Sequence, residues 1–325
     1  HNSTPVDLIL QDRIGDLRPG KGDGMNTGLR YLLSETDSDR IHFYDADITS
    51  FGPEWITQAE IAADRGYDAV RHFFPRSSTD AMITWMITRT GFALLWPSTE
   101  LPRIEQPLGG ELLFTRSVAE ALVADDRVQA QSNWGIDTLY TFATVQSGFS
   151  VYETYVEQGK AHALYGGLTD LKTMLVECFA AIQALRGETV GESVNHEVEA
   201  TAPVPPSITE KVGYDIEATL RMPGQRWNDR QVELLDSFPE AVRTGVLENR
   251  HSATFAFMDE EAWADTNSVL LESFEPGDDD WEELLFKLWV IRVLNYTTTR
   301  ALRGYEHSQR YLRATISDYT ERAVL

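Results

Sequence analysis

Two aspartates one residue apart, Asp45 and Asp47, have the spacing of a binding site for a divalent cation. They follow the apolar stretch Ile41–Tyr44, which predicts a strand. Along an extended chain, residues i and i+2 point to the same side, so both carboxylates would project from the end of that strand into a crevice. Like charges this close repel each other unless a cation lies beside them, and oxygen ligands suit Mg²⁺ or Mn²⁺. The alternative for so short a pattern is a solvated turn after the strand.

Two basic side chains could complete such a site. His162 lies in the stretch Gly159–Gly167, and a neutral imidazole is a good third metal ligand beside carboxylate and phosphate oxygens. Lys21 lies in the glycine-rich segment Gly20–Gly24, from which it could reach a phosphate, although the spacing of a P-loop is absent. The ordinary alternatives are a hydrogen-bonded histidine and a flexible surface turn.

Other residues could bind a small polar substrate. Asp137 could hold a sugar beside the flat wall of Trp134, or it could simply stabilise the start of an apolar helix. Arg76 could bind a carboxylate in two-pronged fashion with the Thr84 hydroxyl as a third contact. A surface ion pair and an ordinary helix hydroxyl are their alternatives. The single cysteine, Cys178, lies in an apolar run, which predicts a buried and inert thiol.

Strands and helices alternate in the first half of the chain, which predicts an α/β fold with active groups at strand ends. The expected strands are 6–11, 41–44 and 68–74. The expected helices are 26–33, capped by Asn26 or Thr27; 53–66; 79–96, capped by Thr79; and 168–185. Two more helices are expected to start at 134–137 and at 278, and a loop is expected over 188–207. Because the strand pattern stops near residue 167, we expect an α/β domain over 1–167 and a helical region over 168–325.

Charge distinguishes this chain of 325 residues: 51 acidic residues against 28 basic ones give a formal net charge of −23. Such a field repels polyanions, so it disfavours nucleic-acid binding and docking on anionic membranes. With only five lysines among the basic residues, the composition predicts a protein that works in high salt. A lone cysteine, no visible signal peptide and no apolar stretch of about 20 residues predict a cytoplasmic protein.

These segments together resemble the mannosylglycerate synthase family of retaining glycosyltransferases. The resemblance is carried by residues 17–26, 41–51, 80–95, 107–111, 134–137 and 162–167 and extends from near residue 11 to the C-terminus. It implies a GT-A nucleotide-sugar-binding domain, which is Rossmann-like, followed by a helical C-terminal region. It also implies transfer of mannose from GDP-mannose to D-glycerate, with Mg²⁺ or Mn²⁺, to give 2-O-α-mannosylglycerate, a compatible solute.

The resemblance also implies roles for individual residues. The metal ligands would be Asp47 and His162, with Asp45 supporting the metal or the ribose. The donor contacts would be Lys21, Gln11, Leu108 and Trp134, with Asp137 on the mannose, and the acceptor contacts would be Arg76, Thr84, Tyr165 and Met174.

Two departures from the family accompany the resemblance. The family continues before the position of His1, so we expect this chain to lack a first strand and helix that contribute to the nucleotide pocket. An arginine follows the metal histidine in the family, whereas this sequence has Ala163.

Alternatives remain open at the level of function. The same chemistry could use GDP-glucose, or lactate or glycolate, and the chain could be a catalytically silent nucleotide-binding or assembly module. Retention could proceed through a covalent intermediate on Asp137 or through front-face attack. The helical region could also form a homo-oligomer interface.

Overall fold

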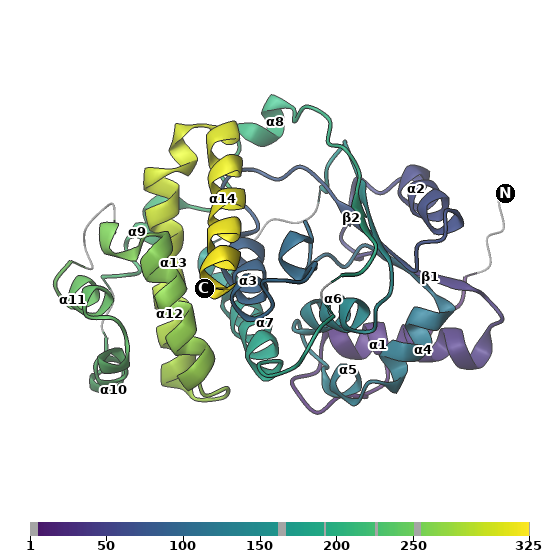
Figure 1. The fold of residues 1–325 in the computed structure, drawn as a ribbon, viewed down its shortest axis with the longest axis horizontal. Coiled ribbons are helices and arrows are strands. Elements are labelled where there is room, and N and C mark those ends of the chain that lie inside the picture. The colour runs from purple at the N-terminus through teal and green to yellow at the C-terminus, as the bar shows by residue number, and fades with distance from the viewer. Residues whose placement is uncertain (1–5, 162–166, 192, 225–226, 250–254, 325) are drawn as a thin grey trace.

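The computed structural model describes residues 6–161, 167–191, 193–224, 227–249 and 255–324 (Figure 1). Within these ranges one mixed sheet of five strands has the order β1-β3-β2-β4-β5. The strands are β1 (Arg40–Phe43), β2 (Ala69–Phe73), β3 (Leu112–Thr115), β4 (Val151–Tyr155) and β5 (His196–Val198). Strands β2, β4 and β5 run parallel, whereas β3 is antiparallel to both β1 and β2. In register, Val70 of β2 lies between Leu113 and Tyr152.

Different helices cover the two faces of the sheet (Figure 1). The helices of this part are α1 (Lys21–Glu35), α2 (Pro53–Asp64), α4 (Arg116–Ala124), α5 (Asp126–Ala130) and α6 (Ile136–Gln146). Leu113 packs with the alanines of α2 in a small core on one face. Its neighbours Leu112 and Phe114 join the main core with α1, α4 and α6 on the other face. This division follows from the alternation of side chains along a strand.

The C-terminal half is mostly helical, and it packs against α3 (Thr90–Leu95) of the first half and through its own α7 (Lys172–Ala184). The remaining helices of the C-terminal half are α8 (Pro206–Thr209), α9 (Ile216–Leu220), α10 (Asp229–Leu234), α11 (Glu240–Asn249), α12 (Glu260–Ser273), α13 (Asp279–Thr299) and α14 (Tyr305–Val324). This half also contains 3₁₀ turns at Leu168–Leu171, Leu235–Ser237, Ala256–Met258 and Ala301–Arg303. In the first half, a π-helix spans Thr84–Arg89 and a 3₁₀ turn spans Leu101–Arg103. α13 is buried along most of its length because apolar side chains lie on all its sides.

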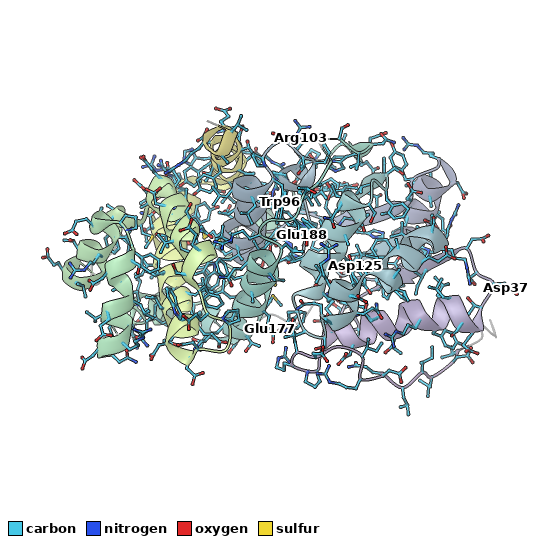
Figure 2. All side chains as sticks on the ribbon, turned by 60° about the horizontal axis from the view of Figure 1, so that its bottom comes forward. Asp37, Trp96, Arg103, Asp125, Glu177 and Glu188 are labelled. Carbon is cyan, nitrogen blue, oxygen red and sulfur yellow. The ribbon has the colours of Figure 1, made fainter. Side chains whose placement is uncertain are left out.

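Single contacts also tie the two halves together. The Trp96 indole at the end of α3 donates a 2.8 Å hydrogen bond from Nε1 to the backbone oxygen of Glu188, after α7 (Figure 2). On the other side, Arg18 Nε donates to Glu177 Oε1 of α7 at 2.6 Å. The loop before α1 and the loop after α7 are therefore both held against neighbouring parts of the molecule.

The fold class expected from the sequence, an α/β domain followed by a helical region, is confirmed. The strands expected over 41–44 and 68–74 and the helices expected over 53–66, 168–185 and from 278 are confirmed within a few residues. The division into domains at residue 167 stays a prediction. No helix in the described ranges is long and apolar enough to cross a bilayer.

The helix expected over 26–33 is confirmed within α1, but α1 begins at Lys21, so neither Asn26 nor Thr27 caps it, and two expectations about the chain before it were wrong. Residues 6–11 form no strand and are exposed, and the segment Gly20–Gly24 is not a turn but the start of α1. In the first turn of α1, the buried Asp23 carboxylate accepts hydrogen bonds from the backbone N–H groups of Ile14 and Gly15 at 3.0 and 2.9 Å, which holds the preceding loop against the helix. A Cβ at Gly22 would lie 2.1 Å from the backbone oxygen of Gln131, so glycine there allows close packing.

Two further expectations were wrong. Thr79 does not cap a helix, because its hydroxyl accepts a 2.7 Å hydrogen bond from the Gly213 N–H and the chain turns at Ala81, whose φ is 58°. The helix begins at residue 82. The stretch 188–207 is not entirely loop, since it contains β5 and the start of α8. Both differences depend on partners far away in the sequence.

Candidate active site

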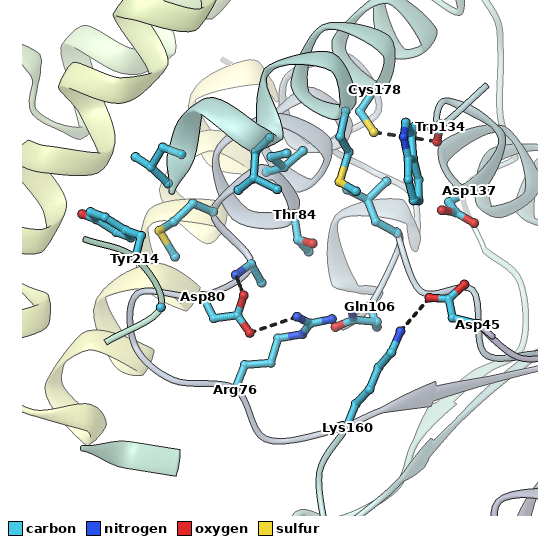
Figure 3. Close-up of a pocket in the computed structure, with 18 of the residues that line it drawn as sticks. Asp45, Arg76, Asp80, Thr84, Gln106, Trp134, Asp137, Lys160, Cys178 and Tyr214 are labelled. Atoms are coloured by element: carbon cyan, nitrogen blue, oxygen red, sulfur yellow. Dashed lines mark hydrogen bonds and ion pairs between the residues drawn. The ribbon is translucent and has the colours of Figure 1, made fainter. Parts of the chain in front are cut away.

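One cavity of about 370 Å³ brings together most of the predicted site residues (Figure 3). Nine of them line it, namely Lys21, Asp45, Asp47, Arg76, Thr84, Leu108, Trp134, Asp137 and Met174. Gln11 does not line it, and its amide Nε2 instead donates to the backbone oxygen of Gly20 at 3.2 Å. His162 and Tyr165 lie outside the described residues. In Figure 3, Asp45 and Lys160 lie on one side of the cavity, Tyr214 lies on the far side, and Arg76 and Thr84 lie between them.

The two aspartates face this cavity from a turn that follows β1. We expected an extended strand end here, and this was wrong. The chain turns at residues 46–47, and the Ile48 N–H donates to the backbone oxygen of Asp45 at 3.4 Å. Asp47 is exposed, whereas Asp45 is partly buried. The pair therefore reaches one cavity through a turn rather than through the alternation of a strand.

Two lysines and three carboxylates form a continuous network on the Asp45 side of the cavity. Lys21 Nζ lies 2.8 Å from Asp137 Oδ2 and 3.2 Å from Asp45 Oδ1. Lys160 Nζ lies 2.6 Å from Asp45 Oδ2 and 2.5 Å from Glu111 Oε1. Both oxygens of Asp45 thus contact an ammonium group. The network thus contains one carboxyl group more than it has ammonium groups.

Burial and ion pairing set the protonation states of this network. Burial would raise the pKa of Asp45, but the ammonium groups of Lys21 and Lys160 outweigh it and hold that pKa below its usual range. Burial raises the pKa of Asp137 in spite of the neighbouring Lys21. Burial alone would lower the pKa of Lys21, but Asp137 and Asp45 raise it overall. Lys21 and Asp45 therefore carry their charges at neutral pH.

Helix starts place the central ion pair. Lys21 is the first residue of α1 and Asp137 lies in the first turn of α6, where a carboxylate is stabilised by the helix dipole. The Lys21 ammonium also lies 5.5 Å from the centre of the Trp134 ring, within reach of a cation–π contact. A Cβ at Gly110 would lie 2.5 Å from Asp45 Oδ1 and 2.6 Å from Lys21 Nζ, so a larger residue at this position would have to displace these two charged groups.

Arg76 and Thr84 line the middle of the cavity, between Asp45 and Tyr214 (Figure 3). Arg76 Nη1 donates to Asp80 Oδ2 at 3.1 Å, and its guanidinium lies 4.7 Å from the centre of the Phe74 ring. Arg76 Nε is buried and has no hydrogen-bond partner among the described residues. The buried Thr84 opens the π-helix, a geometry that often marks functional positions. A ligand with a carboxylate could satisfy this arginine.

Several lining residues were missed by the sequence analysis. Lys160, Asp80, Gln106, Tyr214 and, in contact with Lys160, Glu111 all belong to this site. One signal was available for Lys160, because the chain has only five lysines and a second one, Lys21, was already a candidate.

The donor set fits a hard divalent cation. No group of three or more His, Cys, Asp or Glu side chains able to hold a metal occurs among the described residues, which do not include His162. Mg²⁺ usually binds through one or two carboxylates together with waters and substrate phosphates. Asp45 and Asp47 supply such carboxylate oxygens on one wall of the cavity.

Comparisons with known proteins identify relatives over nearly the whole chain. Residues 1–184 match the family model described as the mannosylglycerate synthase GT domain, and residues 208–316 match that of its C-terminal domain. The mannosylglycerate synthase of Rhodothermus marinus is 65% identical over 322 residues, which cover 99% of this chain and 81% of the relative. That of Selaginella moellendorffii is 56% identical over 312 residues, which cover 95% and 74%.

Solved structures of one enzyme are similar at a lower level. Glucosyl-3-phosphoglycerate synthase from Mycobacterium tuberculosis, in complex with Mn²⁺, UDP-glucose and phosphoglyceric acid, gives a TM-score of 0.43 at 20% identity. The match covers 53% of this chain and 56% of that one. Its complex with Mg²⁺ and UDP gives a TM-score of 0.44 at 20% identity over 53% and 56% of the two chains.

Proposed function

Because this chain belongs to the mannosylglycerate synthase family of glycosyltransferases, we propose that it moves mannose from GDP-mannose to D-glycerate with retention. The product would be 2-O-α-mannosylglycerate. The observation that supports this proposal is one cavity that contains a lysine–carboxylate network and, farther along the same cavity, an arginine. The network suits a metal-bound diphosphate, and the arginine suits a small carboxylic acid.

The diphosphate would bind at the lysine–carboxylate network. Asp47, with Asp45 and His162, would hold Mg²⁺ or Mn²⁺, which when bound neutralises charge on a diphosphate leaving group. Lys21 contributes ammonium N–H donors on the same wall and can exchange an aspartate contact for a phosphate oxygen. The Lys21 ammonium would therefore add a positive charge beside the leaving diphosphate.

The sugar would lie between the diphosphate and the acceptor, against Trp134 and Leu108. Asp137 Oδ1 is buried and has no partner among the described residues, so it is available to accept a hydrogen bond from a sugar hydroxyl. The other oxygen, Oδ2, is paired with Lys21. Pairing with an ammonium weakens a carboxylate as a nucleophile, which favours front-face attack over a covalent intermediate on Asp137.

The acceptor would bind beside the sugar, at Arg76 and Thr84. The Arg76 guanidinium can hold the glycerate carboxylate, and the Thr84 hydroxyl can hold a glycerate hydroxyl. Met174 lines the same cavity, and Tyr165 is expected beside it. Fixing donor and acceptor in one enclosed space supplies the proximity that a two-substrate reaction needs.

A donor and acceptor matrix tests this proposal. GDP release would be measured with GDP-mannose or GDP-glucose against D-glycerate, lactate or glycolate, with Mg²⁺, Mn²⁺ or EDTA. We expect the highest rate with GDP-mannose and D-glycerate, loss of activity in EDTA, and an α-linked product by NMR. A folded chain that binds GDP but releases none from any pair would instead be a silent nucleotide-binding module.

A further inference from the structure

We propose that Lys160 is a positioning residue that, with the buried Glu111, holds Asp45 and the neighbouring turn in place for metal and donor binding. This inference rests on the proposed function for the identity of the donor. Neither residue was a candidate in the sequence, and neither is needed as a substrate contact in the proposed reaction. Their geometry instead connects the two segments that carry the expected metal ligands.

The first step is the burial of the ion pair. The Glu111 side chain has no exposed surface and that of Lys160 is 7% exposed, so their 2.5 Å contact is shielded from solvent. Glu111 directly precedes β3, and its backbone oxygen accepts a 3.1 Å hydrogen bond from the His72 N–H of β2. A carboxylate held this way on the sheet needs a fixed cation beside it. Lys160 supplies that cation and reaches Asp45 with the same ammonium group.

The second step is a set of hydrogen bonds around Lys160. The Thr49 N–H and hydroxyl both donate to the Ala161 oxygen, at 2.7 and 3.0 Å. The Ser50 hydroxyl donates to the Gly159 oxygen at 3.0 Å and accepts from the Ala161 N–H at 2.9 Å. Thr49 and Ser50 lie two and three residues after Asp47, and residues 159–161 directly precede His162. These bonds therefore join the two segments, with Lys160 between them.

The third step is the difference between the two lysines. Lys21 divides its contacts between Asp45 and Asp137, and its side chain is 15% exposed. It can leave Asp45 for a phosphate while Asp45 keeps its other ammonium partner. Lys160 is held by Glu111, whose only ion pair within the described ranges is this one. Lys160 therefore stays on Asp45 when Lys21 turns to the donor.

The test uses three variants of the full chain: Lys160→Met, Glu111→Gln and the double variant. The double variant removes the buried lysine and the carboxylate charge together, so it leaves no unpaired charge at Glu111 to prevent folding. Lys211→Met is the matched control, since Lys211 is exposed and lines a smaller neighbouring cavity together with Lys160. Mn²⁺ binding in the presence of GDP would be followed by the EPR signal of free Mn²⁺, which does not depend on turnover.

We expect Lys160→Met and the double variant to weaken Mn²⁺ binding at least tenfold and to raise KM for GDP-mannose, with KM for D-glycerate unchanged. Glu111→Gln should have a smaller effect, and Lys211→Met should stay within about twofold of the parent chain. A folded double variant that binds Mn²⁺ and GDP as well as the parent would overturn the proposal, as would tighter binding by Lys160→Met, because Lys160 would then be only a counter-ion.

The two proposals fail in different ways. A parent chain that binds Mn²⁺ and GDP but transfers no mannose overturns the proposed reaction and leaves the binding comparison intact. A parent chain that binds neither overturns both.

Discussion

Asp137 and Lys21 form the ion pair on which the donor end of the cavity depends. They lie 116 positions apart in the chain, and the first turns of two helices bring Lys21 Nζ within 2.8 Å of Asp137 Oδ2. Burial raises the pKa of Asp137. As pH falls, Asp137 therefore becomes protonated at a higher pH than an exposed aspartate would, and it then no longer offers an ionised carboxylate to a sugar hydroxyl.

Replacement of Asp137 by Asn should lower kcat by about 100-fold or more, because a buried acceptor placed on the reacting sugar loses its charge. GDP affinity should change by no more than a few fold, since Asp137 does not contact the diphosphate in the proposed arrangement. Initial rates and calorimetric GDP titrations measure the two effects. Asp126→Asn, in the first turn of α5 and exposed, is the control. Near-normal turnover would remove Asp137 from the mechanism.

Replacement of Arg76 by Lys should raise KM for D-glycerate about tenfold, because an ammonium cannot reproduce the two-pronged contact of a guanidinium with a carboxylate. KM for GDP-mannose should stay the same. Steady-state kinetics with each substrate varied in turn would show this. Arg103→Lys serves as the control, since the Arg103 side chain is 72% exposed and pairs with Glu100. An unchanged KM for glycerate would place the acceptor elsewhere.

Secondary-structure elements position the site mainly through their ends. The turn after β1 carries Asp45, the segment before β3 carries Glu111, and residues that follow β4 lead to Lys160. The close approach of these ends depends on Gly110, which lies against both Asp45 and Lys21. A side chain there would have to displace the ion pair rather than a flexible apolar group.

Gly110→Ala should therefore weaken GDP binding about tenfold or more while changing the melting temperature little, because the displaced groups are polar side chains at a cavity. Calorimetry and thermal unfolding would measure the two quantities. Gly191→Ala is the matched control, since a Cβ there meets nothing within 4 Å. Equal GDP affinities for the two variants would contradict the close contact at Gly110.

At the scale of the whole molecule, the His196 side chain connects the edge strand β5 to the rest of the sheet domain. His196 of β5 places Nδ1 3.2 Å from Glu100 Oε2 and Nε2 3.0 Å from Glu153 Oε2. Burial would lower the pKa of His196, but its two carboxylate partners raise it overall. Glu153 also accepts hydrogen bonds from the N–H groups of Glu105 and Gln106, and Gln106 lines the cavity. These three residues, His196, Glu100 and Glu153, form a clamp that joins β5, β4 and the loop beside the site.

This clamp predicts a pH dependence of stability. A histidine whose pKa is raised on folding contributes stability that is complete below its unfolded value of 6.5 and is lost as pH rises through the folded value. His196→Gln should therefore lower the melting temperature most at pH 6 and progressively less above the folded pKa. Scanning calorimetry across this range measures the difference. A gap of the same size at every pH would contradict the charged clamp.

The net charge of −23 predicts a dependence on salt. Screening weakens repulsion between exposed carboxylates, because the Debye length falls from about 10 Å at 0.1 M to about 3 Å at 1 M salt. The melting temperature should therefore rise between 0.1 M and molar KCl. Thermal unfolding at a series of KCl concentrations would show it. A flat or falling melting temperature would count against adaptation to a high-salt cell.

The sequence by itself determined what depends on local order. The spacing of apolar residues predicted α2, α7 and α13, because helix periodicity and capping involve residues only a few positions apart. The long resemblance to one family placed nine site residues that the structure brings to a single cavity.

Only the tertiary structure decided which groups neutralise one another. Lys160 contacts Asp45 from 115 positions away and Glu111 from 49 positions away, and no local pattern encodes such pairs. The loop before α1 is likewise held by Asp23, which accepts hydrogen bonds from Ile14 and Gly15. Ion pairing, close glycine contacts and burial act between segments that meet only in the folded molecule, and for that reason they could not be predicted from residue order.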